Sequence, residues 1–277
     1  MKNKQSAKTI DSPDGVRVHY WISWKPQMTK PFVVIHSGAS MNHSSLEGIE
    51  RGLNERGHPT ILFDQRGIGY SEAPPKREYY SLERYTGDLQ NIIEQEGLVN
   101  PNIFTHSFGF MVAIDYLTKT GNLGKIAGTC ASSNFRKTAN PLLFHVGGKI
   151  MGFGDYVAWA ATWLSNKLSG RKSKYSEQDL AGKTELSVMH AISNVSLKEL
   201  LVHRTNTGLD CWDISEKLKR VKNPIQLVYG KQDLMVRAYA GEQIKRLVKG
   251  KCTISIVDGT HTLPTLYPER VLSQIAY

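Results

Sequence analysis

The sequence is poor in cysteine and has no long apolar run. Its 3 cysteines, Cys130, Cys211 and Cys252, are odd in number and follow no metal-binding spacing, which does not favour a disulfide framework. No apolar run approaches the roughly 18 residues that cross a membrane. The first five residues are not followed by the apolar core of a signal peptide. We therefore expect a cytoplasmic protein with no integral membrane segment.

Acidic residues are fewer than basic ones, but the excess positive charge is not concentrated in one segment of the sequence. There are 35 Lys and Arg residues against 25 Asp and Glu residues, a formal net charge of +10. The basic residues are scattered, with local density at 167–174 and 245–251, and a solvated surface explains the second group. We do not expect nucleic-acid binding, although attraction of anionic substrates is compatible with this charge. The pattern leaves the oligomeric state open.

The apolar pattern predicts a sheet covered by helices. The Asp14-Gly15 turn and the strict alternation over 16–23 predict an N-terminal antiparallel hairpin. Short apolar runs then alternate with amphipathic helical stripes, which is typical of a parallel sheet with both faces covered. We predict an α/β fold with a mostly parallel, doubly covered, eight-stranded sheet. After the hairpin we expect strands over 32–35, 60–63, 102–105, 126–130, 225–229 and 253–257, and the last helices over 240–248 and 268–276.

The alternation of strands and helices stops in the middle third. No strand-like run occurs between about 134 and 212, and aromatic residues recur there at helical spacing. We interpret 134–212 as a helical cap inserted into a core formed by 1–133 and 213–277. No internal repeat or low-complexity segment is present. The 277 residues are enough for one large domain with such an insertion.

The segment from Thr105 to Gly109 is the most informative part of the sequence. It places Ser107 between an apolar run and a helical pattern, which is the context of a nucleophile elbow. Such a turn is so tight that the serine takes a strained backbone conformation and only small neighbours fit beside it. The strain projects the hydroxyl beyond the edge of the sheet. Ser107 is therefore the candidate nucleophile.

Polar residues also follow other predicted strands. His36-Ser37-Gly38 follows an apolar run, Asp64 to Ser71 follows the next, and Asp233 and His261 follow the two strands near the C-terminus. Open parallel sheets gather their reacting groups at the carboxyl ends of the strands. We therefore expect these residues to lie at one edge of the sheet.

At these residues the chain resembles the α/β-hydrolase family. The His36-Ser37-Gly38 turn, the D-x-R-G-x-G-x-S loop from Asp64 to Ser71, the elbow, the G-x-x-D turn ending at Asp233 and the Gly-x-His at His261 form a set in the family's order. The resemblance extends from about residue 14 to the end, except for the middle third. It implies a serine hydrolase with a helical cap, carboxylesterase- or lipase-like, without cofactor or metal.

The resemblance assigns roles to three side chains. Ser107 would attack, His261 would take its proton as general base, and Asp233 would orient the imidazole. The other carboxylates weighed for the last role are Asp210, Asp213 and Asp258. The first two precede a strand, and the third is too close to His261 in sequence.

The oxyanion donors would be backbone N–H groups. One is that of Phe108, and the other is that of Gly38, with Ser37 as the alternative. We expect His36 to hold this turn by hydrogen bonds. The sequence departs from the family pattern at Ser37 and at Thr105, where glycine is usual, which bears on the oxyanion geometry and not on the triad.

Two further expectations concern residues that support the site without reacting. We expect the side chain of His106 to point away from the reaction. We expect Asp64 and Arg66 to brace the glycine-containing loop that they begin.

The cap bears on substrate preference. Trp159 and Trp163, in a helical stripe of aromatic residues, and His36 are candidate residues of the substrate pocket. Packing of the cap onto the core also explains the aromatic stripe. If some of these aromatic residues face the substrate-binding cleft, esters with apolar acyl or aromatic groups are favoured. Thioesterase, amidase and C–C hydrolase chemistry remain alternatives, as does a non-catalytic ligand-binding protein. A serine nucleophile disfavours the epoxide hydrolase branch, and the turn after His36 differs from that of proline iminopeptidases.

Overall fold

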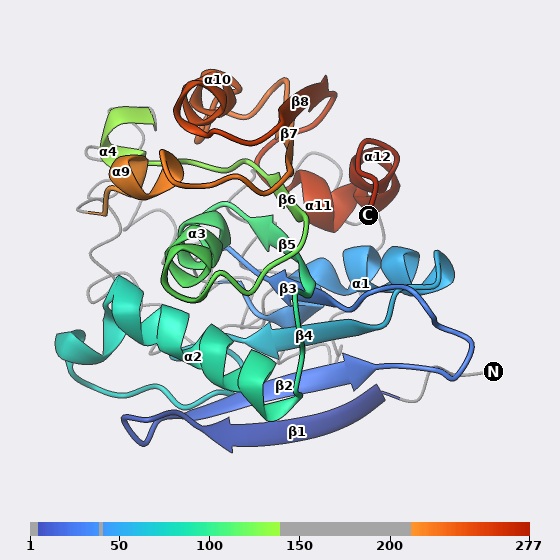
Figure 1. Ribbon diagram of the computed structural model, residues 1–277, viewed down its shortest axis with the longest axis vertical. Helices are drawn as coiled ribbons and strands as arrows, with labels where there is room; N and C mark the ends of the chain where they lie inside the picture. The colour runs from blue at the N-terminus through green and yellow to red at the C-terminus, as the bar shows by residue number, and fades with distance from the viewer. Residues whose placement is uncertain (1–4, 39–40, 139–211) are drawn as a thin grey trace, which may run out of the picture.

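A computed structural model describes residues 5–38, 41–138 and 212–277. Its centre is one eight-stranded sheet with the strand order β1-β2-β4-β3-β5-β6-β7-β8 (Figure 1). The strands are β1 Gln5–Asp11, β2 Arg17–Ser23, β3 Val33–His36, β4 Thr60–Asp64, β5 Asn102–His106, β6 Ile126–Thr129, β7 Ile225–Gly230 and β8 Cys252–Val257.

The sheet is mostly parallel, as predicted. β1 pairs antiparallel with β2, and β2 pairs antiparallel with β4, whereas every pair from β4 to β8 is parallel. The register places His36 opposite Thr105 and His106 opposite Thr129. The carboxyl ends of β3, β5 and β6 therefore lie next to one another at one edge.

Helices cover both faces of the sheet, as Figure 1 shows. One face carries α1 Glu47–Glu55, α11 Leu263–Leu266 and α12 Pro268–Leu272. The other carries α2 Leu82–Gln95, α3 Gly109–Thr120, α9 Ser215–Leu218 and α10 Tyr239–Leu247. The remaining described helices are η1 His43–Leu46, η2 Arg77–Tyr80 and α4 Phe135–Thr138.

The two-sided cover explains the composition of the central strands. Every residue of β3, β4 and β5 is buried. Side chains such as Ile35 and Leu53 pack in the cluster under α1 and α12, while Val34 and Leu89 pack in the cluster under α2 and α3. A strand between two helical layers needs apolar residues on both faces, so it is continuously apolar. The core strands were predictable for this reason.

The C-terminal segment differs from the prediction. We expected one helix over 268–276, but α12 ends at Leu272 and a separate helix, α11, precedes it. The reason lies in contacts to the sheet. The backbone N–H of Ala276 donates to the Gln226 side chain at 2.7 Å, and the Tyr277 hydroxyl donates to the carbonyl of Ile103 at 2.9 Å. These bonds hold the last residues against the sheet.

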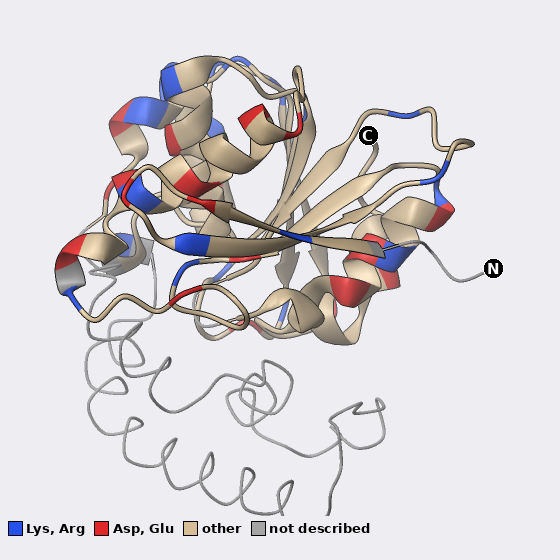
Figure 2. Cartoon of the chain, turned by 90° about the horizontal axis from the view of Figure 1, so that it is seen from below, with Lys and Arg blue, Asp and Glu red and all other residues tan. Residues whose placement is uncertain are grey.

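Further expectations from the sequence concern the surface charge, membrane-spanning helices and the inserted cap. Lysine, arginine, aspartate and glutamate are interspersed on the helices in Figure 2, and the described part of the chain contains no helix long and apolar enough to cross a membrane. The predicted cap, 134–212, falls almost entirely on 139–211, outside the described residues. The cap and its boundaries stay a prediction.

Candidate active site

Ser107 occupies a sharp turn between β5 and α3. Its φ is +50°, a left-handed conformation that is uncommon for a residue with a side chain. The turn is held because the Ser107 N–H donates to the carbonyl of Thr129 at 2.8 Å. Thr105 fits at the elbow's first position because its neighbour across the ladder is Gly128, where a Cβ would lie 2.6 Å from the Thr105 hydroxyl.

Three side chains form a hydrogen-bonded chain that ends at Ser107. The Nε2 atom of His261 lies 3.2 Å from the Ser107 hydroxyl oxygen, and Nδ1 lies 2.9 Å from a carboxylate oxygen of Asp233. Their exposed fractions are only 2 % for His261, 3 % for Asp233 and 7 % for Ser107. Residues 154 positions apart in sequence thus meet at one edge of the sheet.

Asp233 is held in its ionised form. Its second carboxylate oxygen accepts the backbone N–H groups of Met235 at 2.8 Å and Val236 at 2.9 Å. Burial alone raises the pKa of Asp233, but the charge and hydrogen bond of His261 and the Val236 N–H outweigh it, so the pKa lies below its usual value. A carboxylate accepts only, so the facing Nδ1 of His261 carries the proton and Nε2 has a lone pair toward Ser107.

The turns that carry Asp233 and His261 are bound to each other. The Gln232 N–H donates to the carbonyl of Gly259 at 3.0 Å, and the Gly259 N–H donates to the Gln232 side chain at 2.7 Å. These bonds join the loop after β7 to the loop after β8. The loops that carry the carboxylate and the imidazole are therefore held side by side.

Two buried side chains clamp the turn after β3. His36 Nδ1 donates to the carbonyl of Ser37 at 2.8 Å, and Gln65 Nε2 donates to the carbonyl of Gly38 at 2.6 Å. In a trans peptide the N–H points opposite to the C=O, so holding the Ser37 carbonyl also fixes the direction of the Gly38 N–H. Burial lowers the pKa of His36 to about 4, so its ring is neutral near pH 7.

His106 lies elsewhere than expected. Its ring does not point away from the hydrogen-bonded chain, because its centroid is 4.9 Å from that of His261. Its Nδ1 is 2.8 Å from the Thr129 hydroxyl, which is on the adjacent strand β6. Burial, and next the His261 charge, hold the pKa of His106 well below its usual value. A neutral ring therefore packs against the imidazole of His261.

A family model described as the alpha/beta hydrolase fold matches residues 30–264, most of the chain. The chain belongs to the α/β-hydrolase family. Its activity is the subject of the proposal below.

The curated relatives match different shares of this chain. "Probable oxidoreductase EphD" of Mycobacterium tuberculosis is 25 % identical over an alignment of 298 positions that covers 96 % of this chain and 48 % of that protein. A proline iminopeptidase of Lactobacillus delbrueckii subsp. lactis is 29 % identical over 89 residues, 31 % of this chain and 30 % of that protein. The chain thus spans about half the length, or less, of these curated relatives.

Solved structures share the fold along nearly the whole chain. The esterase EaEST of Exiguobacterium antarcticum has a TM-score of 0.70 at 19 % identity and covers 96 % of each chain. The enol-lactonase of Burkholderia xenovorans LB400 has a TM-score of 0.72 at 17 % identity, with 95 % of this chain and 96 % of that chain covered. At these identities the likeness shows the α/β-hydrolase fold alone.

Asp64 and Arg66 brace the loop from Asp64 to Ser71, as expected. Asp64 accepts the backbone N–H of Tyr70 at 2.9 Å and that of His43 at 2.7 Å. Arg66 is fully buried and pairs with Asp88 at 2.6 Å and with Asp14 at 2.7 Å. The loop thus joins η1, α2 and the N-terminal hairpin.

The other candidate carboxylates in the described residues have hydrogen-bond partners outside the hydrogen-bonded chain that ends at Ser107. Asp213 accepts from Asn134 and Lys137, and Asp258 accepts from Gln232. His36 is fully buried, which favours its holding role over that of a pocket residue. The remaining candidates, Trp159, Trp163 and Asp210, lie outside the described residues.

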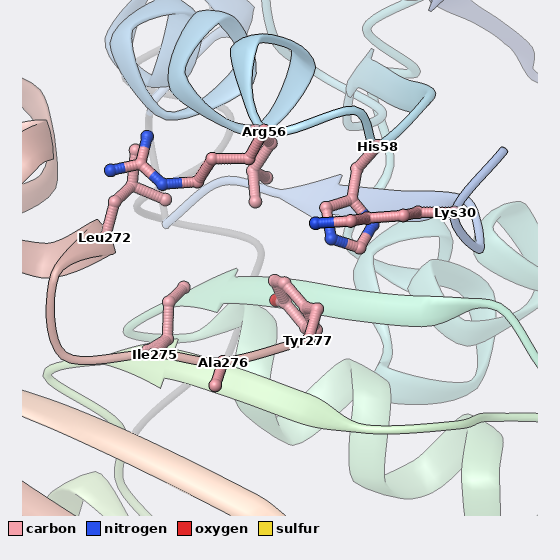
Figure 3. Close-up of a pocket in the computed structure, with 8 residues that line it drawn as sticks. Lys30, Arg56, His58, Leu272, Ile275, Ala276 and Tyr277 are labelled. Atoms are coloured by element: carbon pink, nitrogen blue, oxygen red, sulfur yellow. The ribbon is translucent and has the colours of Figure 1, made fainter. Parts of the chain in front are cut away.

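A small cavity of about 230 Å³ lies at the opposite edge of the sheet (Figure 3). Lys30 and His58, which line it, come just before β3 and β4, and Tyr277 lines it from the C-terminal segment. The other residues that line it belong to α1, α12 and the C-terminal segment, apart from Arg56, which directly follows α1. None of the candidate site residues takes part in this cavity.

Proposed function

We propose that the chain is a serine hydrolase that cleaves carboxylic esters through an acyl-enzyme intermediate, with a preference for apolar acyl or aromatic groups. The observation that carries the proposal is the hydrogen-bonded chain from Ser107 through His261 to Asp233. A serine hydroxyl is a weak nucleophile, and a neutral imidazole at hydrogen-bond distance is the base that activates it.

The reaction proceeds in two halves. In the first, Nε2 of His261 takes the Ser107 proton while Oγ bonds to the ester carbonyl carbon, and the alkoxide leaves with that proton. In the second, a water loses its proton to His261 and attacks the acyl carbon, which releases the acid and restores Ser107. Asp233 keeps the imidazole in the required tautomer and balances the charge of the imidazolium.

The tetrahedral intermediate of each half carries a negative oxygen. The N–H groups of Phe108 and Gly38 would donate to it. The clamps on the Gly38 turn by His36 and Gln65 support this role, because donors fixed before the reaction need no reorganisation during it.

Fluorophosphonate labelling tests the proposal without knowledge of the substrate. We expect one stoichiometric adduct on Ser107, located by mass spectrometry, and loss of the adduct in His261→Ala. Asp233→Asn should slow labelling by about 10³- to 10⁴-fold, as expected when the imidazole tautomer is no longer held. Asp258→Asn is the matched control and should label at the wild-type rate. Absence of an adduct on folded wild-type protein would refute the proposal.

The acyl preference needs a separate measurement. Aryl esters from acetate to octanoate should show kcat/KM rising with chain length, and rates indifferent to chain length would remove the apolar preference. Matched thioesters and amides in the same assay separate ester chemistry from the other reactions that a triad supports. A lactone belongs in the panel because a lactone is an internal ester.

A further inference from the structure

Cys130 adjoins the Asp233–His261 pair, and all three side chains are of types that can bind a metal ion. The sulfur of Cys130, a carboxylate oxygen of Asp233 and a ring nitrogen of His261 lie within 4.8 Å of one another, and all three residues are buried. Cys130 directly follows β6, and its thiol lies 3.9 Å from the backbone carbonyl of His261. Among the described residues, this is the one group of three side chains able to hold a metal.

The backbone fixes the thiol in this position. Cys130 has a φ of +52°, and its N–H donates to the carbonyl of Val228 in β7 at 3.1 Å. A left-handed conformation costs a residue with a side chain about 1–2 kcal/mol, so surrounding contacts must hold it. The Cys130 side chain also donates a hydrogen bond to Asp233, which contributes to the lowered pKa of that carboxyl.

The donor set has the chemistry of a soft cation site. Thiolate, imidazole and carboxylate are the ligands that Zn²⁺ takes in proteins, and a thiolate selects Zn²⁺ or Cd²⁺ over Mg²⁺ and Ca²⁺. One thiolate and one carboxylate neutralise the two positive charges of the ion. That balance matters because an uncompensated charge in a buried site is costly.

The present geometry is close to what coordination requires. Tetrahedral bonds of about 2.0–2.3 Å put neighbouring ligand atoms about 3.3–3.7 Å apart. The Asp233 oxygen and the His261 nitrogen are now 2.9 Å apart, and no pair in the group exceeds 4.8 Å. The carboxylate and the ring must therefore separate by about 0.4 Å and the thiol must approach by about 1 Å at most, which small side-chain rotations allow.

We propose that Cys130, Asp233 and His261 bind a soft divalent cation such as Zn²⁺, and that the bound cation inactivates Ser107. The ring proton of His261 moves from Nδ1 to Nε2, and the cation binds the Nδ1 lone pair that this exposes. The Cys130 thiol loses its proton to solvent. Nε2 then faces Ser107 as a donor and cannot accept its proton. The inactivation rests on the function proposed above, whereas binding of the cation does not.

Cd²⁺ titration tests binding independently of activity. In the double variant Cys211→Ser, Cys252→Ser, Cys130 is the sole cysteine, and we expect a thiolate-to-cadmium charge-transfer band in the ultraviolet that saturates at one ion per chain. Adding Cys130→Ser should remove the band. No band at millimolar Cd²⁺, or a band that survives loss of Cys130, would overturn the site. Circular dichroism checks that each variant is folded, and Cys130→Ala replaces Cys130→Ser if the serine variant is not.

Fluorophosphonate labelling then tests the consequence. Saturating Cd²⁺ or Zn²⁺ should slow labelling of Ser107 in the sole-cysteine variant by about 100-fold or more, because a general base contributes 10²–10⁴-fold, and a chelator should restore it. Cys130→Ser should label equally with and without the cation. A band with unchanged labelling overturns the inactivation. A band on a protein whose Ser107 never labels leaves the cation site standing and overturns the serine hydrolase.

Discussion

Gly109 is the position at which a single methyl group should disturb the candidate site most. A Cβ there would lie 2.6 Å from Nδ1 of His36 and 2.9 Å from the carbonyl oxygens of His36 and Ser37. Two of these three atoms are backbone atoms, so no flexible side chain can move aside. Gly109→Ala therefore forces the start of α3 away from the turn that carries the candidate oxyanion donor Gly38.

The size of the effect follows from the contact distances. The methyl group would be about 0.8 Å inside the 3.4 Å at which ordinary van der Waals contact begins. Overpacking of this kind costs about 1–3 kcal/mol. Replacing glycine by alanine in a helix returns about 0.5–1 kcal/mol, and less at the first helical residue. We expect a net destabilisation of about 1–2 kcal/mol, and labelling of Ser107 slowed by up to about 100-fold, since a misplacement near 1 Å costs about that much.

Urea unfolding and fluorophosphonate labelling measure the two effects. Gly87→Ala is the matched control, because Gly87 lies inside α2 and a Cβ there meets nothing within 4 Å. We expect this control to gain about 0.5–1 kcal/mol and to label at the wild-type rate. If Gly109→Ala were as stable as Gly87→Ala and labelled equally fast, the close approach of α3 to the turn would not constrain the site.

Two further predictions concern stability. The pKa of His36 is about 4 in the folded protein and near 6.5 in the unfolded chain, so between these pH values the unfolded chain binds a proton that the folded protein excludes. The free energy of unfolding should therefore fall by on the order of 3 kcal/mol as the pH drops from about 6.5 to about 4. Urea titrations of His36→Gln should show a weaker pH dependence. Arg66→Met leaves the buried carboxylate of Asp88 without its cation and leaves Asp14 with the partly exposed Arg84 alone, and should cost about 3–5 kcal/mol. Arg56→Gln, which breaks an exposed pair, should cost at most about 1 kcal/mol, and equal losses in urea unfolding would contradict this account.

The sequence predicted the core because local and tertiary requirements agree there. The strands over 60–63 and 225–229 lie within one residue of β4 and β7, since a continuous apolar run bounded by turn residues suits a strand covered on both faces. The final helix was predicted too long because its end depends on hydrogen bonds to Gln226 and Ile103, far away in sequence. No local pattern carries that information.

The same contrast applies to the candidate site. Ser107, Asp233 and His261 were identifiable because each follows a strand in a motif of fixed order, and the structure brings the three together. Gln65 was missed, although it donates to the Gly38 carbonyl, since its neighbours in sequence do not indicate where its amide points. Cys130 is buried, but its proximity to Asp233 depends on the pairing of β6 with β7, which the sequence around Cys130 does not indicate.

The long sequence separation within the hydrogen-bonded chain has a consequence during protein synthesis. Ser107 leaves the ribosome 154 residues before His261, and at about 5–20 residues per second this interval lasts roughly 8–30 s. Until β7 and β8 join the sheet, the serine has neither base nor carboxylate. On the proposed mechanism, a nascent chain could fold its first strands around Ser107 and remain chemically inert. Reactivity would appear only when the last two strands dock.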